Sequence, residues 1–206
     1  MSRGFTLIEL IVVIAIFSVV TSISLFNQGK LNSTILVTNL AYEIALAVRE
    51  AQTYGVGVRA DGTGGSFEGG YGISFDINRP NEIILFTDTI DSNHLVDEGE
   101  EVSTMLIQNQ RGNKIVAICR GAVSNPKCMT GSEHNVTLLN IIFRRPNPEA
   151  VFLSSNGSGQ TSDDAAGPAY IVVNTPAGNN CRVIIVEKTG QIRVDNGSSG
   201  LCDNGS

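Results

Sequence analysis

Residues 4–26 read GFTLIELIVVIAIFSVVTSISLF, and this stretch decides the architecture of the chain. From Phe5 to Phe26 it contains a single charged residue, Glu9. A helix needs roughly 20 predominantly apolar residues to cross the hydrocarbon core of a bilayer, so the stretch is long enough to span a membrane. Arg3 is the only cation that precedes it. The positive-inside rule therefore places the amino terminus in the cytoplasm and the residues after 26 outside the membrane.

Glu9 is the unusual residue of this segment. A carboxylate inside an apolar helix costs on the order of 1–3 kcal/mol, depending on its depth, and usually marks a function. A cleaved secretory signal fits poorly, because the apolar run is long, the charged region before it is minimal and no A-x-A-like site follows it. A plain signal anchor in front of an unrelated external domain would leave Glu9 without a role.

The hexapeptide Gly4-Phe5-Thr6-Leu7-Ile8-Glu9, together with its apolar helix, resembles the prepilin signature of type IV pilins and type II secretion pseudopilins. The resemblance implies that a prepilin peptidase cuts between Gly4 and Phe5 and methylates the new amino terminus at Phe5. It also implies that Glu9 registers an incoming subunit through the amine of a neighbouring first residue. The physics agrees, because in hydrocarbon a carboxylate and an ammonium reduce each other's burial penalty.

The same resemblance implies the partners of the chain. They are other pilin or pseudopilin subunits, the prepilin peptidase and methyltransferase, the inner-membrane assembly platform and membrane lipid.

A second helical segment follows from residue 31 to residue 54. Its apolar residues recur every three or four positions, which places them on one stripe of a helix: Leu40, Ile44, Ala47, Val48 and Ala51. We expect this stripe to lie on a sheet. Residues 27–30 read NQGK, a weakly helical stretch where we expect the rod to bend or melt. Many pilins carry a proline near this point, where this chain has Phe26.

After Gly55 the pattern changes from helix to strand. Eight glycines from Gly55 to Gly72 predict a loop, and no G-x-x-x-x-G-K-[ST] pattern supports a nucleotide-binding loop there. Short strands are predicted at 71–77, 82–88, 101–108, 114–120, 135–145, 150–154, 169–174, 181–188 and 191–194. Residues 188–191 are typical of a hairpin turn. Many short strands separated by turn residues favour an antiparallel sheet or two packed sheets.

The predicted fold class is α+β, with a long amino-terminal transmembrane and amphipathic helix packed on an antiparallel β domain. Its parts are a leader peptide at 1–4, a transmembrane half of the helix at 5–26, a second half at 27–54 and an extracytoplasmic β-rich domain at 55–206. This order is similar to that of minor pseudopilins and fimbrial-type minor pilins, whose external domain has two small sheets against the helix. The phrase LAYEIALAVREA at residues 40–51 resembles the second half of their helix. We therefore expect a pilin-like fold. The order of the elements favours the minor class, and the helix phrase does not by itself separate a minor from a major subunit.

Four cysteines lie outside the membrane in this topology: Cys119, Cys128, Cys181 and Cys202. An oxidising compartment favours two disulfides, with three possible connectivities. The sequence-local one pairs Cys119 with Cys128 and Cys181 with Cys202, and many pilins close a loop near their carboxy terminus in this way. A zinc site that combines these cysteines with His94 and His134 is the alternative, but the chain has no C-x-x-C pair.

Two acidic stretches have the ligands that calcium prefers, but neither has the D-x-[DN]-x-[DN]-G spacing. They comprise Asp88, Asp91, Asp97, Glu98, Glu100 and Glu101, and in the tail Asp195, Asn196 and Asp203. We expect solvated surfaces there and no metal. With two histidines and no G-x-S-x-G motif, the chain has little material for catalysis, so we expect neither an enzyme nor a cofactor.

Arg144 and Arg145 form the densest basic spot, and a contact with DNA or another subunit would use them together with Arg111 and Lys114. DNA binding is disfavoured because phosphate affinity comes largely from Lys and Arg and the net charge is −6. Asn-x-Ser/Thr sequences occur at Asn32, Asn135, Asn156, Asn196 and Asn204, as a chain rich in Ser and Asn would give without glycosylation.

The sequence thus predicts a single-pass inner-membrane protein with its carboxy-terminal domain outside the cytoplasm. After processing it would enter a cell-surface or periplasmic filament, either a type IV pilus or a type II secretion pseudopilus. The alternative is a bitopic membrane-anchored extracytoplasmic domain that binds a ligand or DNA and does not polymerise.

Overall fold

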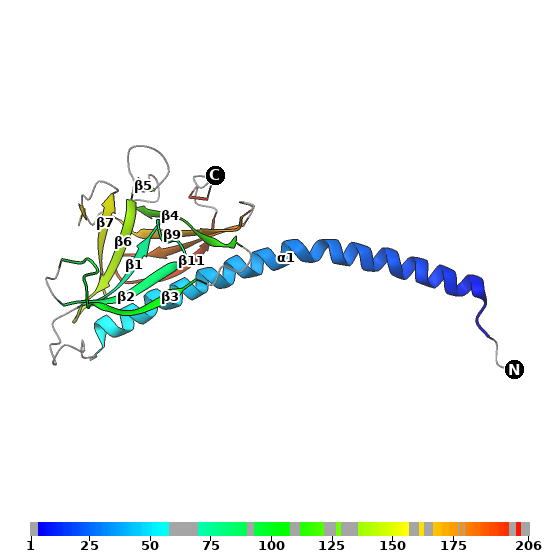
Figure 1. Cartoon of the computed structure of the whole chain (residues 1–206), viewed down its shortest axis with the longest axis horizontal. Helices are drawn as coiled ribbons and strands as arrows, with labels where there is room; N and C mark the ends of the chain where they lie inside the picture. Colours follow the sequence, from blue (N-terminus) through cyan, green and yellow to red (C-terminus); the bar gives the residue numbers. More distant parts are fainter. Residues whose placement is uncertain are drawn as a thin grey trace.

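The computed structural model describes residues 4–57, 70–89, 93–107, 112–121, 127–128, 136–156, 161–162, 167–176, 178, 180–197 and 201–202, with the backbone alone at 26–32, 127–128, 156 and 161–162. A single long helix, α1 (Leu7–Val56), is followed by strands. Figure 1 shows the amino-terminal half of α1 projecting as a rod from a β-rich head, with the amino terminus at its far end.

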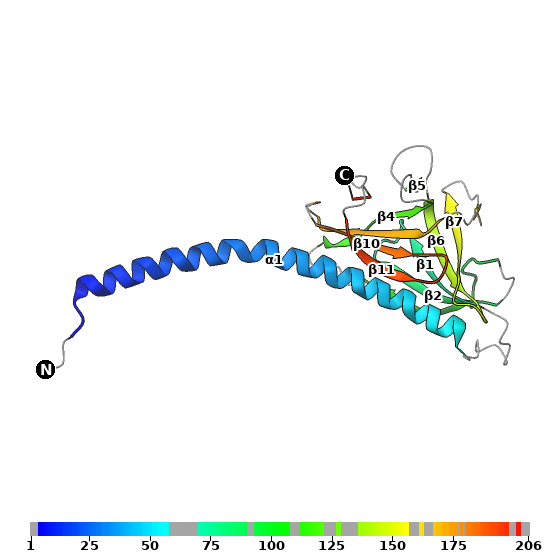
Figure 2. The ribbon, with the colours of Figure 1, turned by 180° about the vertical axis from the view of Figure 1, so that it is seen from behind.

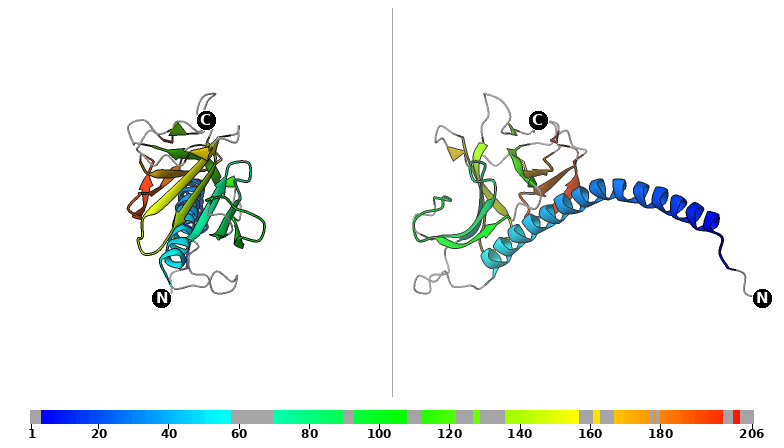
Figure 3. Two further views of the ribbon diagram at one scale, coloured as in Figure 1. Left: turned by 90° about the vertical axis from the view of Figure 1, so that its left-hand side faces the viewer. Right: turned by 45° about the vertical axis from the view of Figure 1, so that its right-hand side comes forward.

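Helix α1 begins at a polar cap and runs without interruption into the head. Thr6 has extended backbone angles (φ −81°, ψ 150°), and its side chain accepts a hydrogen bond from the backbone N–H of Glu9. At the other end the N–H of Gly57 donates to the carbonyl of Thr53 at 2.9 Å. Residues 27–30 lie inside the helix, so the expectation that they melt is wrong. An interior glycine lowers helix stability by about 1 kcal/mol, which is too little to interrupt a helix that is already formed on both sides of it. The rod instead curves along its length (Figure 3).

The predicted apolar stripe of the second half is confirmed. Its buried members are Val37, Leu40, Ala41, Ile44, Ala47, Val48 and Ala51. This face of α1 contacts strands of two different sheets. A helix with one apolar face gains stability by burying that face on a sheet, at roughly 25 cal/mol per Å² of apolar area.

Within the described residues all strand pairs are antiparallel, and the strands form two sheets. The first sheet has the order β3 (Glu101–Leu106), β2 (Glu82–Asp88), β1 (Gly70–Asp76), β6 (Val136–Phe143), β7 (Ala150–Asn156) and β8 (Thr161–Ser162). The second has the order β11 (Ile192–Asn196), β10 (Cys181–Val186), β9 (Ala169–Asn174), β4 (Lys114–Arg120) and β5 (Lys127–Cys128). The α+β fold predicted from the sequence is confirmed. The two-residue strands β5 and β8 were not predicted, because such short strands carry no periodicity.

The inner faces of both sheets and the buried face of α1 form one core. Strand β9 shows how alternation divides its residues: Ile171 and Val173 belong to this core, whereas Tyr170 and Val172 face the opposite side of the second sheet. There they pack with Leu201 of the carboxy-terminal segment. Figure 2, seen from behind, shows β10 and β11 running alongside the second half of α1.

Candidate functional site

The amino-terminal segment presents its polar groups at the tip of the rod. Gly4 and Phe5 precede the helix, and Phe5 is 81% exposed. The hydroxyl of Thr6 lies 3.4 Å from Oε2 of Glu9, and the backbone N–H of Glu9 donates to that hydroxyl at the same distance. Thr6 and Glu9 have the spacing of a capping box, in which a threonine and a glutamate three residues apart satisfy helix-end donors. The carboxylate of Glu9 also lies at the positive end of the helix dipole.

Behind this cap lies the stretch Leu7–Leu25, which is long and apolar enough to cross a membrane and is not buried within the protein. Its few hydroxyls are satisfied inside the helix. Ser18, Thr21, Ser22 and Ser24 each donate to the carbonyl four residues earlier, at 2.7, 2.7, 2.8 and 3.1 Å. In hydrocarbon an unsatisfied hydroxyl would cost several kcal/mol, so these bonds suit a lipid environment. In this stretch Glu9 is the one charged side chain.

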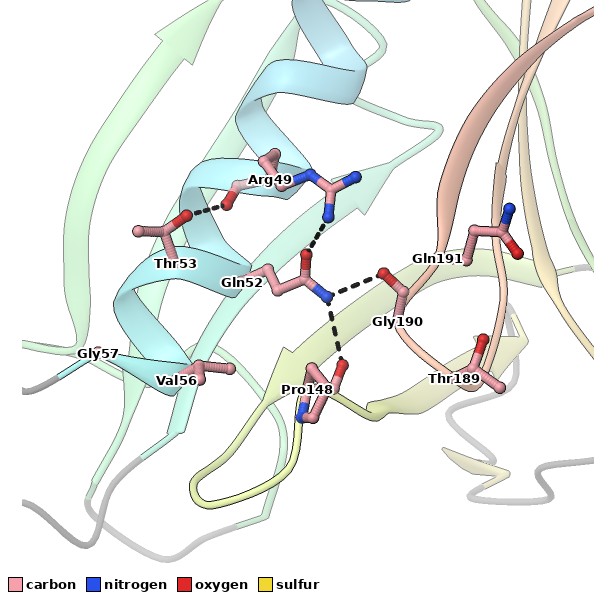
Figure 4. Close-up of a pocket in the computed structure, with 9 residues that line it drawn as sticks. All are labelled: Arg49, Gln52, Thr53, Val56, Gly57, Pro148, Thr189, Gly190 and Gln191. Atoms are coloured by element: carbon pink, nitrogen blue, oxygen red, sulfur yellow. Dashed lines mark hydrogen bonds between the residues drawn. The ribbon is translucent and has the colours of Figure 1, made fainter.

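The other end of α1 is clamped to the head by Gln52. Its side-chain Nε2 donates to the carbonyls of Gly190 at 2.8 Å and Pro148 at 3.3 Å, and its Oε1 accepts from Nη1 of Arg49 at 2.6 Å. Figure 4 shows these bonds, with Arg49 and Gln52 on α1 and the carbonyls of Gly190 and Pro148 facing the amide. The clamp lies in an open groove of about 670 Å³ between the last turns of α1 and residues 189–191. Gln52 thus ties the last turns of α1 to the turn before β11 and to the segment before β7.

The structure contains a disulfide between Cys181 and Cys202, which ties the carboxy-terminal segment to β10. Cys119 is also disulfide-bonded, and Cys128 lies opposite it in the β4–β5 pair. We propose that these two cysteines are bonded to each other. Oxidised sulfurs are not thiolate ligands, so the zinc alternative loses its cysteines; His94 lies in the head and His134 lies outside the described residues.

Part of the first acidic stretch is buried rather than solvated. The side chain of Asp88 is fully buried and is paired with Arg144, while Nε2 of His94 lies 4.0 Å from the same carboxylate. Glu100 is 1% exposed and accepts from the backbone N–H groups of Thr89 and Asp97 at 2.7 and 3.2 Å. The expectation of a solvated surface is therefore wrong for Asp88 and Glu100, because each carboxylate is needed inside as an acceptor.

No group of three or more His, Cys, Asp and Glu side chains is arranged to hold a metal within the described part of the chain. In the tail, Asp195 is paired with Arg193 at 3.4 Å. Three predicted ligands or basic residues, Asp91, Arg111 and Asp203, lie outside the described residues, as do the asparagines of two of the Asn-x-Ser/Thr sequences, Asn135 and Asn204. Arg144 serves as the partner of buried Asp88, which removes it from a free basic patch.

Two of these features carry signals that sequence analysis overlooked. The T-x-x-E spacing of Thr6 and Glu9 is a readable capping box. Gln52 stands among the buried apolar positions of α1, where a polar residue requires partners. The pairing of Asp88 with Arg144 has no local signal, because the two residues are 56 positions apart.

Comparison with known proteins identifies the amino-terminal segment. Residues 1–25 match the family model described as the prokaryotic N-terminal methylation motif. No curated protein matches the chain, and neither does any solved structure. The matched residues include Gly4, Phe5 and Glu9 and reach the end of the exposed apolar stretch. This chain therefore carries, in its first 25 residues, the methylation motif of pilin-type precursors, which supports its assignment to the type IV pilin and pseudopilin family.

Proposed function

We propose that the protein is a structural subunit, of the minor class, of a type IV pilus or a type II secretion pseudopilus. The observation that carries the proposal is the methylation motif at residues 1–25, which includes the exposed apolar stretch Leu7–Leu25, on a helix that continues into a β-rich head. The motif is that of precursors processed by prepilin peptidase, and family members are structural subunits rather than enzymes. Order and content of the chain, one long helix and then two small antiparallel sheets, support the minor class by resemblance.

In this proposal the peptidase removes residues 1–4 and methylates Phe5, while α1 anchors the precursor in the inner membrane with the head outside the cytoplasm. The assembly platform then extracts the subunit into a cell-surface or periplasmic filament. Before assembly, Thr6 offers the Glu9 carboxylate a hydroxyl. A neighbour's ammonium is a stronger partner, because in hydrocarbon it offsets the negative charge of the carboxylate, which a neutral hydroxyl does not. Exchanging the hydroxyl for that amine would favour incorporation.

Two measurements test the proposal. The mass of the mature protein should equal the chain from Phe5 with one added methyl group. Glu9→Ala should lower incorporation into filaments at least tenfold and leave the head folded, with Glu98→Ala, which removes an exposed carboxylate of the head, as the control. An intact Met1 would instead favour the bitopic anchor, which binds a ligand without polymerising. Undiminished incorporation of the Glu9→Ala chain would contradict the role of this carboxylate.

A further inference from the structure

The second half of α1 has an exposed face that the head does not cover. Ile35, Tyr42 and Leu46 are 55, 57 and 69% exposed. They are seven and four residues apart, so at 3.6 residues per turn they form one stripe opposite the buried face. Single exposed apolar residues are ordinary on a protein surface, whereas an aligned stripe of large ones marks an interaction surface.

The two flanks of this stripe carry opposite charges. On the helix, Glu43 and Glu50 lie about 60–80° to one side of the stripe and Arg49 lies about 40° to the other. All three are exposed. Within the described residues, Glu43 and Arg49 form no ion pair; Arg49 donates to the neutral amide of Gln52 instead. Glu50 accepts from the hydroxyl of Tyr54 at 2.6 Å.

The flank with Arg49 is also hollowed. The groove that holds the Gln52 clamp opens beside Arg49, with Val56 and Pro148 as apolar lining (Figure 4). On the opposite flank the carboxylate of Glu43 stands beside Leu46 of the stripe. One side of the helix therefore has a positive charge beside an open groove, and the other side has a negative charge beside an apolar side chain.

We infer that the groove beside Arg49 in one copy of this chain receives Leu46 and Glu43 of a second copy. The two helices are parallel in this contact. The inference rests on the proposed filament function and names its contact surface. Because the two flanks differ, the contact is heterologous, and a heterologous contact that does not close builds a helical filament.

The axial displacement that this contact requires is close to the one that the proposed Glu9 contact requires. Glu43 precedes Arg49 by six residues, or about 9 Å along a helix. The second copy must therefore be displaced by that distance toward the head for its Glu43 to stand level with Arg49. The proposed contact between Glu9 and the amine of a neighbour's Phe5 spans four residues and requires a displacement of about 6 Å in the same direction. The long, flexible side chain of Arg49 can span the difference between these two displacements. After the shift, Leu46 of the second copy lies level with Gln52 and Thr53.

Cysteine cross-linking in cells that carry the assembly machinery tests this contact. Two full-length chains with different tags are produced together, one with Leu46→Cys and the other with Thr53→Cys, and oxidised in the membrane. We expect a dimer that contains both tags. Each variant produced alone should give at least fivefold less dimer, because a heterologous contact does not bring identical residues together. Equal dimer from Leu46→Cys alone would overturn the heterologous arrangement.

Charge reversal then tests the ion pair. Glu43→Arg and Arg49→Glu should each reduce the mixed dimer at least fivefold, and the double variant Glu43→Arg/Arg49→Glu should restore it. Glu98→Arg and Lys114→Glu, which reverse exposed charges on the head, serve as controls. Failure of the double variant to restore the dimer would overturn the pair. If no mixed dimer forms while Glu9→Ala still lowers incorporation, this surface is wrong and the filament proposal stands. Cross-links to a different pilin would overturn a second copy as the occupant.

Discussion

The interior of the head holds single polar residues whose partners come from distant parts of the chain. Asp88 on β2 is paired with Arg144 just after β6, and the side-chain amide of Asn140 donates to the carbonyl of His94 at 2.7 Å. Arg120, 6% exposed, lies over the ring of Phe152 at 4.0 Å from its centroid. A buried charge without such a partner would cost several kcal/mol, so these contacts fix how the strands and loops sit together.

Tyr170 is one of four residues with a buried side-chain polar atom that has no hydrogen-bond partner within the described structure; the other atoms are Oδ1 of Asn140, Nε of Arg144 and Oγ1 of Thr175. Burial raises the pKa of Tyr170, the nearby Glu187 carboxylate raises it further, and Arg193 opposes them. Tyr170→Phe should therefore raise the free energy of unfolding by about 1 kcal/mol at pH 7, because it removes an unsatisfied polar group. Urea unfolding of the detergent-solubilised protein measures this.

The pH dependence of the same variant has a definite sign. Above pH 10 the unfolded wild type ionises Tyr170 while the folded form keeps its proton, so the stability of the wild type falls as pH rises through that window. The Phe variant lacks this loss, and its advantage should grow above pH 10. Tyr42→Phe, which removes the hydroxyl of a residue that is 57% exposed, is the control. Its free energy of unfolding should differ from that of the wild type by the same amount at pH 7 and above pH 10. A Tyr170→Phe protein less stable than wild type at pH 7 would show that the hydroxyl has a partner.

At the scale of elements, the close approach of α1 to β6 depends on Gly55. A Cβ added there would lie 2.8 Å from Cβ of Phe143 and would also meet its backbone carbonyl. Gly55→Ala gains at most about 1 kcal/mol of helix propensity, whereas overpacking costs roughly 1–3 kcal/mol. We expect a net loss of about 1 kcal/mol in urea unfolding. Thr53→Ala, on the exposed side of the same turn, should change stability by less than about 0.5 kcal/mol. Equal stability of the Gly55→Ala protein would mean that the helix end shifts freely on the sheet.

The elements also show which parts of the fold could be predicted from the sequence and which could not. Strong periodicity made α1 and most strands predictable; β2, β4 and β9 have the predicted bounds. The order of the strands within each sheet was not predictable, because neighbours such as β4 and β9 are hydrogen-bonded to each other although some 50 residues separate them in the chain. For the candidate site, the sequence identifies Gly4, Phe5 and Glu9 because their motif is contiguous. It does not identify the groove beside Arg49, because that groove forms only when β10 and β11 are in place.

The whole molecule combines two parts that suit different solvents. The first half of α1 exposes apolar side chains and satisfies its own hydroxyls, as a helix in lipid must. The head instead covers its apolar residues on both faces of the second sheet. The outer face has a thin cover: Leu201, 1% exposed, packs there with Tyr170 and Val183, and the Cys181–Cys202 disulfide holds this segment in place.

Removing the Cys181–Cys202 disulfide should therefore destabilise the head and leave the amino-terminal half of α1 unchanged. A loop closed over 21 residues limits the unfolded chain by roughly 3 kcal/mol in the chain-entropy account. Cys181→Ser/Cys202→Ser should lower the free energy of unfolding by about 2–4 kcal/mol, and Leu201→Ala, with the disulfide intact, by about 2 kcal/mol through lost burial. Membrane insertion should remain, since it depends on residues 5–26, and fractionation of the membranes checks this. If the double serine variant unfolds like wild type, the segment at Leu201 is held by its packing and the disulfide contributes nothing to the stability of the head.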